Sequence, residues 1–112
     1  MELLKTYLIK PEQSVVLAEF TQLNSTCNVP VNNGDNGILL VAYTEQAGNH
    51  LYVAEGDGVF AGDEKEIPLE ANKYTVTYLE SGPFMFHKGK EKGHIRLYSD
   101  SENVTAAAIQ LK

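Results

Sequence analysis

The chain has 112 residues, which is enough for one ordinary domain with its own core, and its hydrophobic (43%) and charged (21%) fractions are typical of a globular protein. The formal net charge of −6 argues against nucleic-acid binding, because that function relies on a basic face that displaces counterions from phosphates. The longest uninterrupted apolar run, residues 38–43, is far shorter than a membrane-spanning helix, so no membrane partner is expected.

The N-terminal quarter of the chain allows two interpretations. Pro11 and the two residues after it could open a helix that places Val16, Phe20 and Leu23 on one face. The β-branched and aromatic residues between positions 15 and 21 favour a strand instead. Because the rest of the chain is rich in strand signals, the strand is the preferred prediction.

Turn-forming residues then punctuate the chain at short intervals, which is typical of many short strands. A dense turn cluster at residues 32–37 leads into residues 38–44, which are predicted to form a central strand buried on both faces. Residues 45–49 carry the next turn. We therefore expect residues 38–44 and 50–54 to pair as a hairpin.

The middle of the chain continues this pattern. A glycine-rich loop contains Val59 and Phe60, which are expected to fold back and plug one end of the core. Pro68 cannot donate to a central ladder, so residues 66–69 are expected to form a short edge strand. Residues 74–79 alternate in character and predict a half-exposed strand with three large side chains on one face, Tyr74, Val76 and Tyr78.

The last third contains a lysine loop at residues 87–93, between a bend at residues 81–83 and two further strands at residues 95–98 and 104–111. Short strands joined by turns predict an all-β fold. The expected architecture is a single-domain antiparallel β-sandwich or partly closed barrel of about seven to eight short strands. The domain spans residues 1–112, and its first twelve residues are free to form an extended arm.

Residues suited to catalysis or metal binding are few. The chain has three histidines, namely His50, His87 and His94. No cysteine or carboxylate stands at the spacing from them that a metal site requires. Cys27 is the one cysteine; it cannot form an internal disulfide, which fits synthesis in a reducing cytoplasm, and no basic neighbour activates it. Neither a phosphate-binding glycine motif nor a nucleophile motif occurs. We therefore expect a protein that is not an enzyme and holds no cofactor or metal.

Charge is divided unevenly along the chain. Between positions 88 and 96, Glu91 stands alone against four basic residues, Lys88, Lys90, Lys92 and Arg96. Residues 55–70, in contrast, hold six carboxylates against Lys65. Two interpretations of the basic run remain open. It is a solvated hairpin tip, or it is a contact loop that meets an acidic surface on a partner or on a neighbouring copy, for which residues 55–70 would be the natural complement.

The order of turns and strands resembles that of small β-sandwich structural proteins of tailed bacteriophages and prophages. The resemblance rests on segments spread over most of the chain, namely residues 33–37 (NGDNG), 41–44 (VAYT), 51–53 (LYV), 56–62 (GDGVFAG), 67–69 (IPL), 79–84 (LESGPF), 92–95 (KGHI) and 104–111. Pro83 stands where many of those proteins carry Arg, so no contact made by that Arg is carried over to this chain. These segments are structural turns and strands, and they imply no active site.

The resemblance implies a capsid decoration protein, also called a cement protein, that binds the outer surface of a virion and stabilises it. Its partner would be the major capsid protein, bound many times over the lattice, and self-association is left open. The expected contact residues are Lys88, Lys90, Lys92 and Arg96. The alternative is a ligand- or carbohydrate-binding module of a phage fibre or bacterial surface. It would need exposed aromatic residues on one face, for which Tyr52, Tyr74 and Tyr78 are candidates, although all three are expected in the core.

Overall fold

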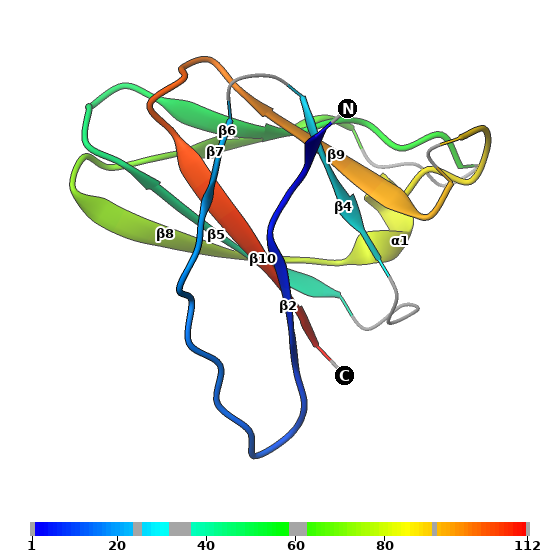
Figure 1. Cartoon of the computed structure of the whole chain (residues 1–112). Coiled ribbons are helices and arrows are strands. Elements are labelled where there is room, and N and C mark those ends of the chain that lie inside the picture. The colour runs from blue at the N-terminus through cyan, green and yellow to red at the C-terminus, as the bar shows by residue number, and fades with distance from the viewer. Residues whose placement is uncertain (1, 24–25, 32–36, 59–62, 91, 112) are drawn as a thin grey trace.

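The computed structural model describes residues 2–23, 26–31, 37–58, 63–90 and 92–111. These residues form two β-sheets packed face to face, with one short helix, α1 (Ser81–Phe84), at an end of the sandwich (Figure 1). The predicted all-β sandwich is therefore confirmed, although the described ranges contain ten strands and not seven to eight. Within these ranges no helix is long and apolar enough to cross a membrane.

Each sheet is built from strands that lie far apart in the sequence. The strands of sheet A are, in spatial order, β1 (Glu2–Leu3), β4 (Cys27–Pro30), β9 (His94–Ser99), β6 (His50–Val53) and β7 (Lys65–Pro68). The strands of sheet B are β2 (Thr6–Ile9), β10 (Thr105–Leu111), β5 (Ile38–Thr44) and β8 (Lys73–Leu79), with β3 (Thr21–Gln22) also beside β10.

The N-terminal segment contributes to both sheets. β1 runs parallel to β4 in sheet A, and β2 runs parallel to β10 in sheet B. Leu4 lies between the two strands, where it is buried and donates its backbone N–H to the carbonyl oxygen of Asn28 at 2.9 Å. The first residues are thus extended, and they close one side of the sandwich by switching from one sheet to the other.

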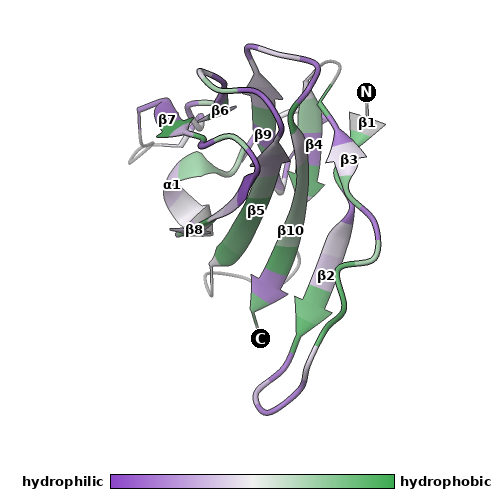
Figure 2. Ribbon diagram, turned by 90° about the vertical axis from the view of Figure 1, so that its left-hand side faces the viewer, coloured by the Kyte–Doolittle hydropathy of each residue, from purple (hydrophilic) through white to green (hydrophobic). Residues whose placement is uncertain are grey.

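The core lies between the two sheets and follows from the alternation of side chains along each strand. Figure 2 shows the apolar colour along β5 and β10, the two central strands of sheet B. The side chains of both sheets that meet in the core are almost fully buried and include Ile38, Leu40, Leu51, Val53, Ile95, Leu97, Ala106 and Ala108. Cys27 belongs to the same cluster and is completely buried.

The predicted hairpin between residues 38–44 and 50–54 is wrong. β5 pairs with β10 and β8 in sheet B, whereas β6 pairs with β9 and β7 in sheet A. The turn between them crosses from one sheet to the other and is held by Thr44, whose hydroxyl oxygen accepts a hydrogen bond from the side-chain amide of Asn49 at 2.9 Å. β5 is a long strand that finds long partners in β8 and β10, and this full-length pairing outweighs the local turn signal.

The strand predicted between positions 15 and 21 is also largely wrong, because pairing is limited to β3. Most of residues 10–20 forms an irregular loop between β2 and β3, and Figure 1 shows this loop extending past the lower end of the sandwich. The Tyr7 hydroxyl of β2 accepts a hydrogen bond from the backbone N–H of Glu19 and donates one to its carbonyl oxygen. The Phe20 ring lies 5.8 Å from the Tyr74 ring of β8. These side-chain contacts hold the segment without a ladder of backbone bonds.

The remaining strand predictions are confirmed: the central strand is β5, the edge strand with Pro68 is β7, and the last three are β8, β9 and β10. β1, β2, β4 and α1 were not predicted as elements, and the first two lie in the segment expected to form an extended arm. The turn expected at residues 32–36 and the core plug expected from Val59 and Phe60 lie outside the described residues.

Candidate functional site

The lysine loop is closed at its base by the strand that follows it. The N–H of Phe86 donates to the carbonyl of His94 at 2.9 Å, and the N–H of Gly93 donates to the carbonyl of Phe86 at 2.8 Å. Gly89 and Gly93 have φ angles of 77° and 84°, which favour glycine. The loop thus leaves the sandwich and returns to it at one point, at the start of β9.

A second loop, residues 54–58, supports the lysine loop from the side. The Asp57 carboxylate accepts a hydrogen bond from the backbone N–H of His87 at 2.6 Å. A Cβ atom at Gly56 would collide with the Pro83 carbonyl oxygen, and one at Gly58 would lie 2.8 Å from the His87 ring. The two glycines therefore let these loops approach closely, which gives the Gly-Asp-Gly sequence a structural role.

Three of the four predicted contact residues line one hollow between these loops. The hollow has a volume of about 340 Å³, and we call it the lysine cleft; its lining residues are Asp57, Phe86, Lys88, Gly89, Lys90 and Arg96. Arg96 lies on β9 and not on the loop, and its guanidinium carbon is 5.0 Å from the centre of the Phe86 ring, a cation–π distance. Lys92 is exposed on the same loop but does not line the cleft.

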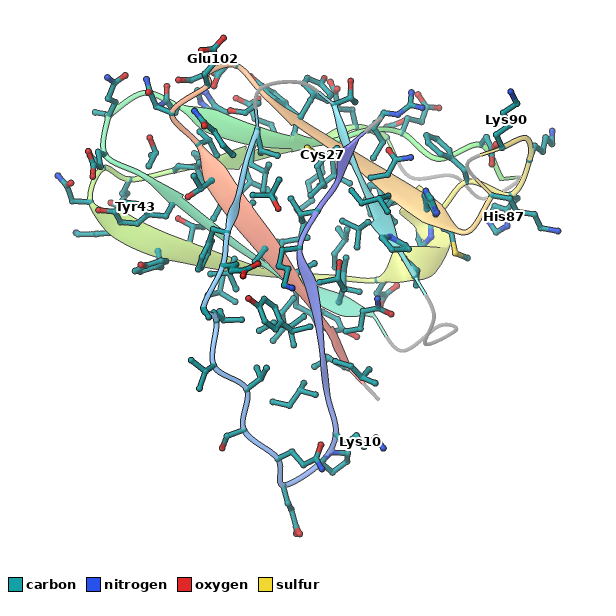
Figure 3. All side chains as sticks on the ribbon, in the orientation of Figure 1. Lys10, Cys27, Tyr43, His87, Lys90 and Glu102 are labelled. Atoms are coloured by element: carbon teal, nitrogen blue, oxygen red, sulfur yellow. The ribbon has the colours of Figure 1, made fainter. Side chains whose placement is uncertain are left out.

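The described lining residues of the lysine cleft carry more positive than negative charge. Among these residues, Asp57 is the one carboxylate, and it already accepts the His87 N–H. In the described part of the chain, Lys88, Lys90 and Lys92 form no ion pair with a carboxylate. Figure 3 shows Lys90 projecting from one end of the molecule, while Lys10 lies far from it. An open, positively charged hollow of this kind can receive an acidic side chain or another anionic group.

His50 belongs to a second polar cluster, which joins three strands of sheet A. Its Nδ1 lies 2.9 Å from an Asp100 carboxylate oxygen and its Nε2 lies 3.2 Å from a Glu66 oxygen. The His50 backbone N–H also donates to Asp100 at 2.9 Å. This backbone bond, helped by the imidazole, holds the pKa of Asp100 below its ordinary value. The cluster joins β6 and β7 to the residue that follows β9, and its contacts are those of a polar network at the surface.

Neither the His50 cluster nor any other place in the described ranges brings three His, Cys, Asp or Glu side chains into a metal-binding group. Next to the cluster, the ring of Tyr52 stacks on that of Tyr98 at 5.0 Å. Desolvation and the carboxylates of Glu66 and Asp100 raise the pKa of Tyr52. The other two histidines lie apart, because His87 packs against Gly58 and His94 lies beside Asn28.

The expectation that Tyr74 and Tyr78 are buried in the core is wrong. Together with Val76 they form an apolar strip on the outer side of sheet B, which we call the β8 face. Their exposed fractions are 64% for Tyr74, 60% for Val76 and 56% for Tyr78. The inward positions of β8 are instead taken by Thr75 and Thr77, opposite Ala42 and Leu40.

The three tyrosines considered for carbohydrate binding therefore do not share a face. Tyr52 lies on the outer side of sheet A, whereas Tyr74 and Tyr78 lie on sheet B. Comparisons with protein-family models, with curated proteins and with solved structures find no match to the chain. Two surfaces of unlike chemistry, the lysine cleft and the β8 face, are the candidate functional sites.

Proposed function

We propose that the chain is a non-enzymatic capsid decoration protein of a tailed bacteriophage or prophage, and that it binds the outer capsid surface through the lysine cleft. The observation that carries this proposal is the gathering of Lys88, Lys90 and Arg96 around one hollow in a protein of net charge −6. The virion as the place of action follows from the resemblance of the sequence to small phage sandwich proteins.

The geometry of the cleft supports a binding role because hydrogen bonds fix the backbone of the loop that carries the lysines. The loop is closed by two backbone hydrogen bonds at Phe86 and braced by Asp57, so little ordering is required when a partner binds. An acidic patch on the major capsid protein is the complement in charge, and it would steer the encounter.

The exposure of the lysines also bears on the kind of partner. Exposed ion pairs contribute about 0.2–1 kcal/mol each, whereas a micromolar complex requires about 8 kcal/mol. A few such pairs cannot hold one copy on one partner. A capsid lattice presents the same acidic patch many times, so an assembly with several copies of the chain could bind several patches at once, and these contacts would add up through multivalency.

A co-sedimentation experiment tests this proposal. The purified full-length chain is mixed at low salt with expanded, empty capsids of the phage or prophage that encodes it, and the capsids are pelleted. We expect the chain in the pellet and expect Lys90→Glu to lower the bound amount by about tenfold, because an attraction becomes a repulsion. Lys10→Glu is the matched control, since it makes the same charge change at a distant exposed site. A chain that stays in the supernatant, or an equal loss in both variants, contradicts the proposal.

One observation favours a second candidate function, binding of a carbohydrate by the β8 face. Tyr74 and Tyr78 project from one strand with Val76 between them, an arrangement on which sugar rings can stack. This alternative predicts a signal on a glycan array that Tyr74→Ala abolishes and Lys90→Glu leaves unchanged. A glycan array without signal contradicts carbohydrate binding by the β8 face.

A further inference from the structure

β8 is the outermost strand of sheet B, and its position leaves one side of its backbone facing outward. All seven of its residues pair with β5, from Lys73 opposite Thr44 to Leu79 opposite Ile38. Among the described strands, β5 is its one neighbour. In an antiparallel pair the N–H and C=O groups of alternate residues point away from the partner, so β8 presents a row of donors and acceptors at the edge of the sheet.

β7, at one edge of sheet A, shows the features that normally protect an edge strand against pairing with another chain. β7 is four residues long, displays Lys65 and Glu66, and contains Pro68, three features that discourage pairing with another chain. β8 has seven residues and no proline, and its one charged residue, Lys73, lies at its end. The side chains between its ends are apolar or hydroxylated. β8 is thus long and regular, and between its ends it carries neither the proline nor the charged residues that mark β7.

The sequence of β8 also matches itself when it is turned around. In an antiparallel pair centred on Val76, Val76 lies opposite Val76 of the second copy, and Tyr74 lies opposite Tyr78 of the second copy. On the inward face, Thr75 lies opposite Thr77 of the second copy. Aromatic pairs and threonine pairs are favourable cross-strand neighbours, and no like charges meet in this register.

We propose that two copies of the chain pair antiparallel through β8, about a two-fold axis at Val76, so that their B sheets join into one continuous sheet. Such an interface uses the same patch on both copies and closes on itself, which limits assembly to a dimer. The pairing satisfies the outward backbone groups and lines up the exposed side chains of both copies. Phe20 and Tyr43, whose rings lie 5.8 and 4.8 Å from that of Tyr74, extend the apolar strip.

The dimer uses a different surface from the proposed capsid contact. In Figure 1, β8 runs along the lower left of the molecule, while Figure 3 places Lys90 at the far right in the same orientation. Both lysine clefts therefore stay open in the dimer. This dimer differs from a head-to-tail contact between the lysine loop and residues 55–70, which would be governed by charge.

Sedimentation of the full-length chain tests the dimer and its axis. We expect a mass twice that of the 12.4 kDa chain, and expect Val76→Lys and Val76→Glu each to weaken dimerisation by about tenfold or more, because like charges then meet at the axis. An equimolar mixture of these two variants should recover the dimer, since opposite charges then meet. Val16→Lys is the matched control, because Val16 is 81% exposed and lies outside β8. A monomeric wild-type chain, or dissociation by Val16→Lys, overturns the proposal.

Disulfide trapping fixes the register without relying on a destabilising change. Val76→Cys places two thiols opposite each other, within the Cα separation that a disulfide spans, and oxidation should yield covalent dimers. Tyr78→Cys is the control, because the two substituted positions lie four residues apart along the paired strands. Cys27 is completely buried and gives no background. Failure of Val76→Cys to cross-link, or equal cross-linking of both variants, overturns the two-fold axis at Val76.

Discussion

The lysine cleft gathers cations on a loop, whereas the β8 face gathers apolar side chains on a strand. The cleft is assembled from two loops and from Arg96 of β9, so its shape depends on tertiary contacts such as the one between Asp57 and His87. The β8 face needs only the alternation of one strand in its sheet. The two surfaces should therefore respond differently to packing defects and to salt.

Gly56→Ala is expected to give the largest difference between the effect on the lysine cleft and the effect on the β8 face. A Cβ there meets the backbone carbonyl of Pro83, which cannot move without displacing the base of the lysine loop. We expect a loss of about 1–3 kcal/mol in the free energy of unfolding, measured by urea denaturation, and a weaker capsid interaction. Dimerisation through β8 should be unchanged.

Gly58→Ala sharpens that experiment, because its Cβ would meet the side chain of His87, which can rotate away. We expect a smaller loss of stability than in Gly56→Ala. An equal loss in both variants would contradict the view that the backbone contact at Pro83 positions the cleft.

Salt should weaken binding through the lysine cleft but not pairing through β8, and we expect this effect to be of intermediate size. Raising the ionic strength from about 0.01 M to about 0.15 M shortens the Debye length from about 30 Å to about 8 Å and screens exposed charges. We expect capsid binding through Lys88 and Lys90 to fall by about tenfold in pelleting assays, while the dimer mass stays constant. Salt-independent capsid binding would remove the lysine cleft from the contact.

The smallest effect is expected from Asp100→Asn, since Asp100 lies in the His50 cluster and outside both surfaces. Its folded-state pKa is lowered, so the carboxylate stabilises the folded chain at pH values above the ordinary value of 3.8, and this contribution is lost as the pH falls through the lower folded-state value. Because the group is exposed, the substitution should cost no more than about 1 kcal/mol near neutral pH. Thermal unfolding should show that difference shrinking below pH 3.8, and a difference that grows in acid would contradict this role.

The strands and the basic residues of the cleft were predictable because both are local signals. Alternation identified β8 and β9, and the run of charges identified Lys88, Lys90 and Arg96. The other lining residues were not predictable, because Asp57 reaches the cleft through a glycine contact that the sequence does not encode locally. His50, Glu66 and Asp100 likewise come from separate strands and meet through sheet pairing alone.

The alternation of β8 indicated that Tyr74, Val76 and Tyr78 share a face, but it did not indicate which face turns inward. Hydrophobicity favoured burial of that face. The register with β5 decides otherwise, because it places Thr75 and Thr77 opposite the buried Ala42 and Leu40. Apolar side chains that are exposed together on one face are typical of a surface that binds a partner.

The sedimentation mass of the full-length chain at low and at high salt tests most directly whether the two surfaces act separately. A dimer of constant mass at both salt concentrations is the predicted result, since backbone pairing and apolar contact along β8 are insensitive to screening. A monomer at low salt would contradict the account. So would a dimer that dissociates as salt rises, because the contact would then be ionic and would join the lysine loop to residues 55–70 of a neighbouring copy.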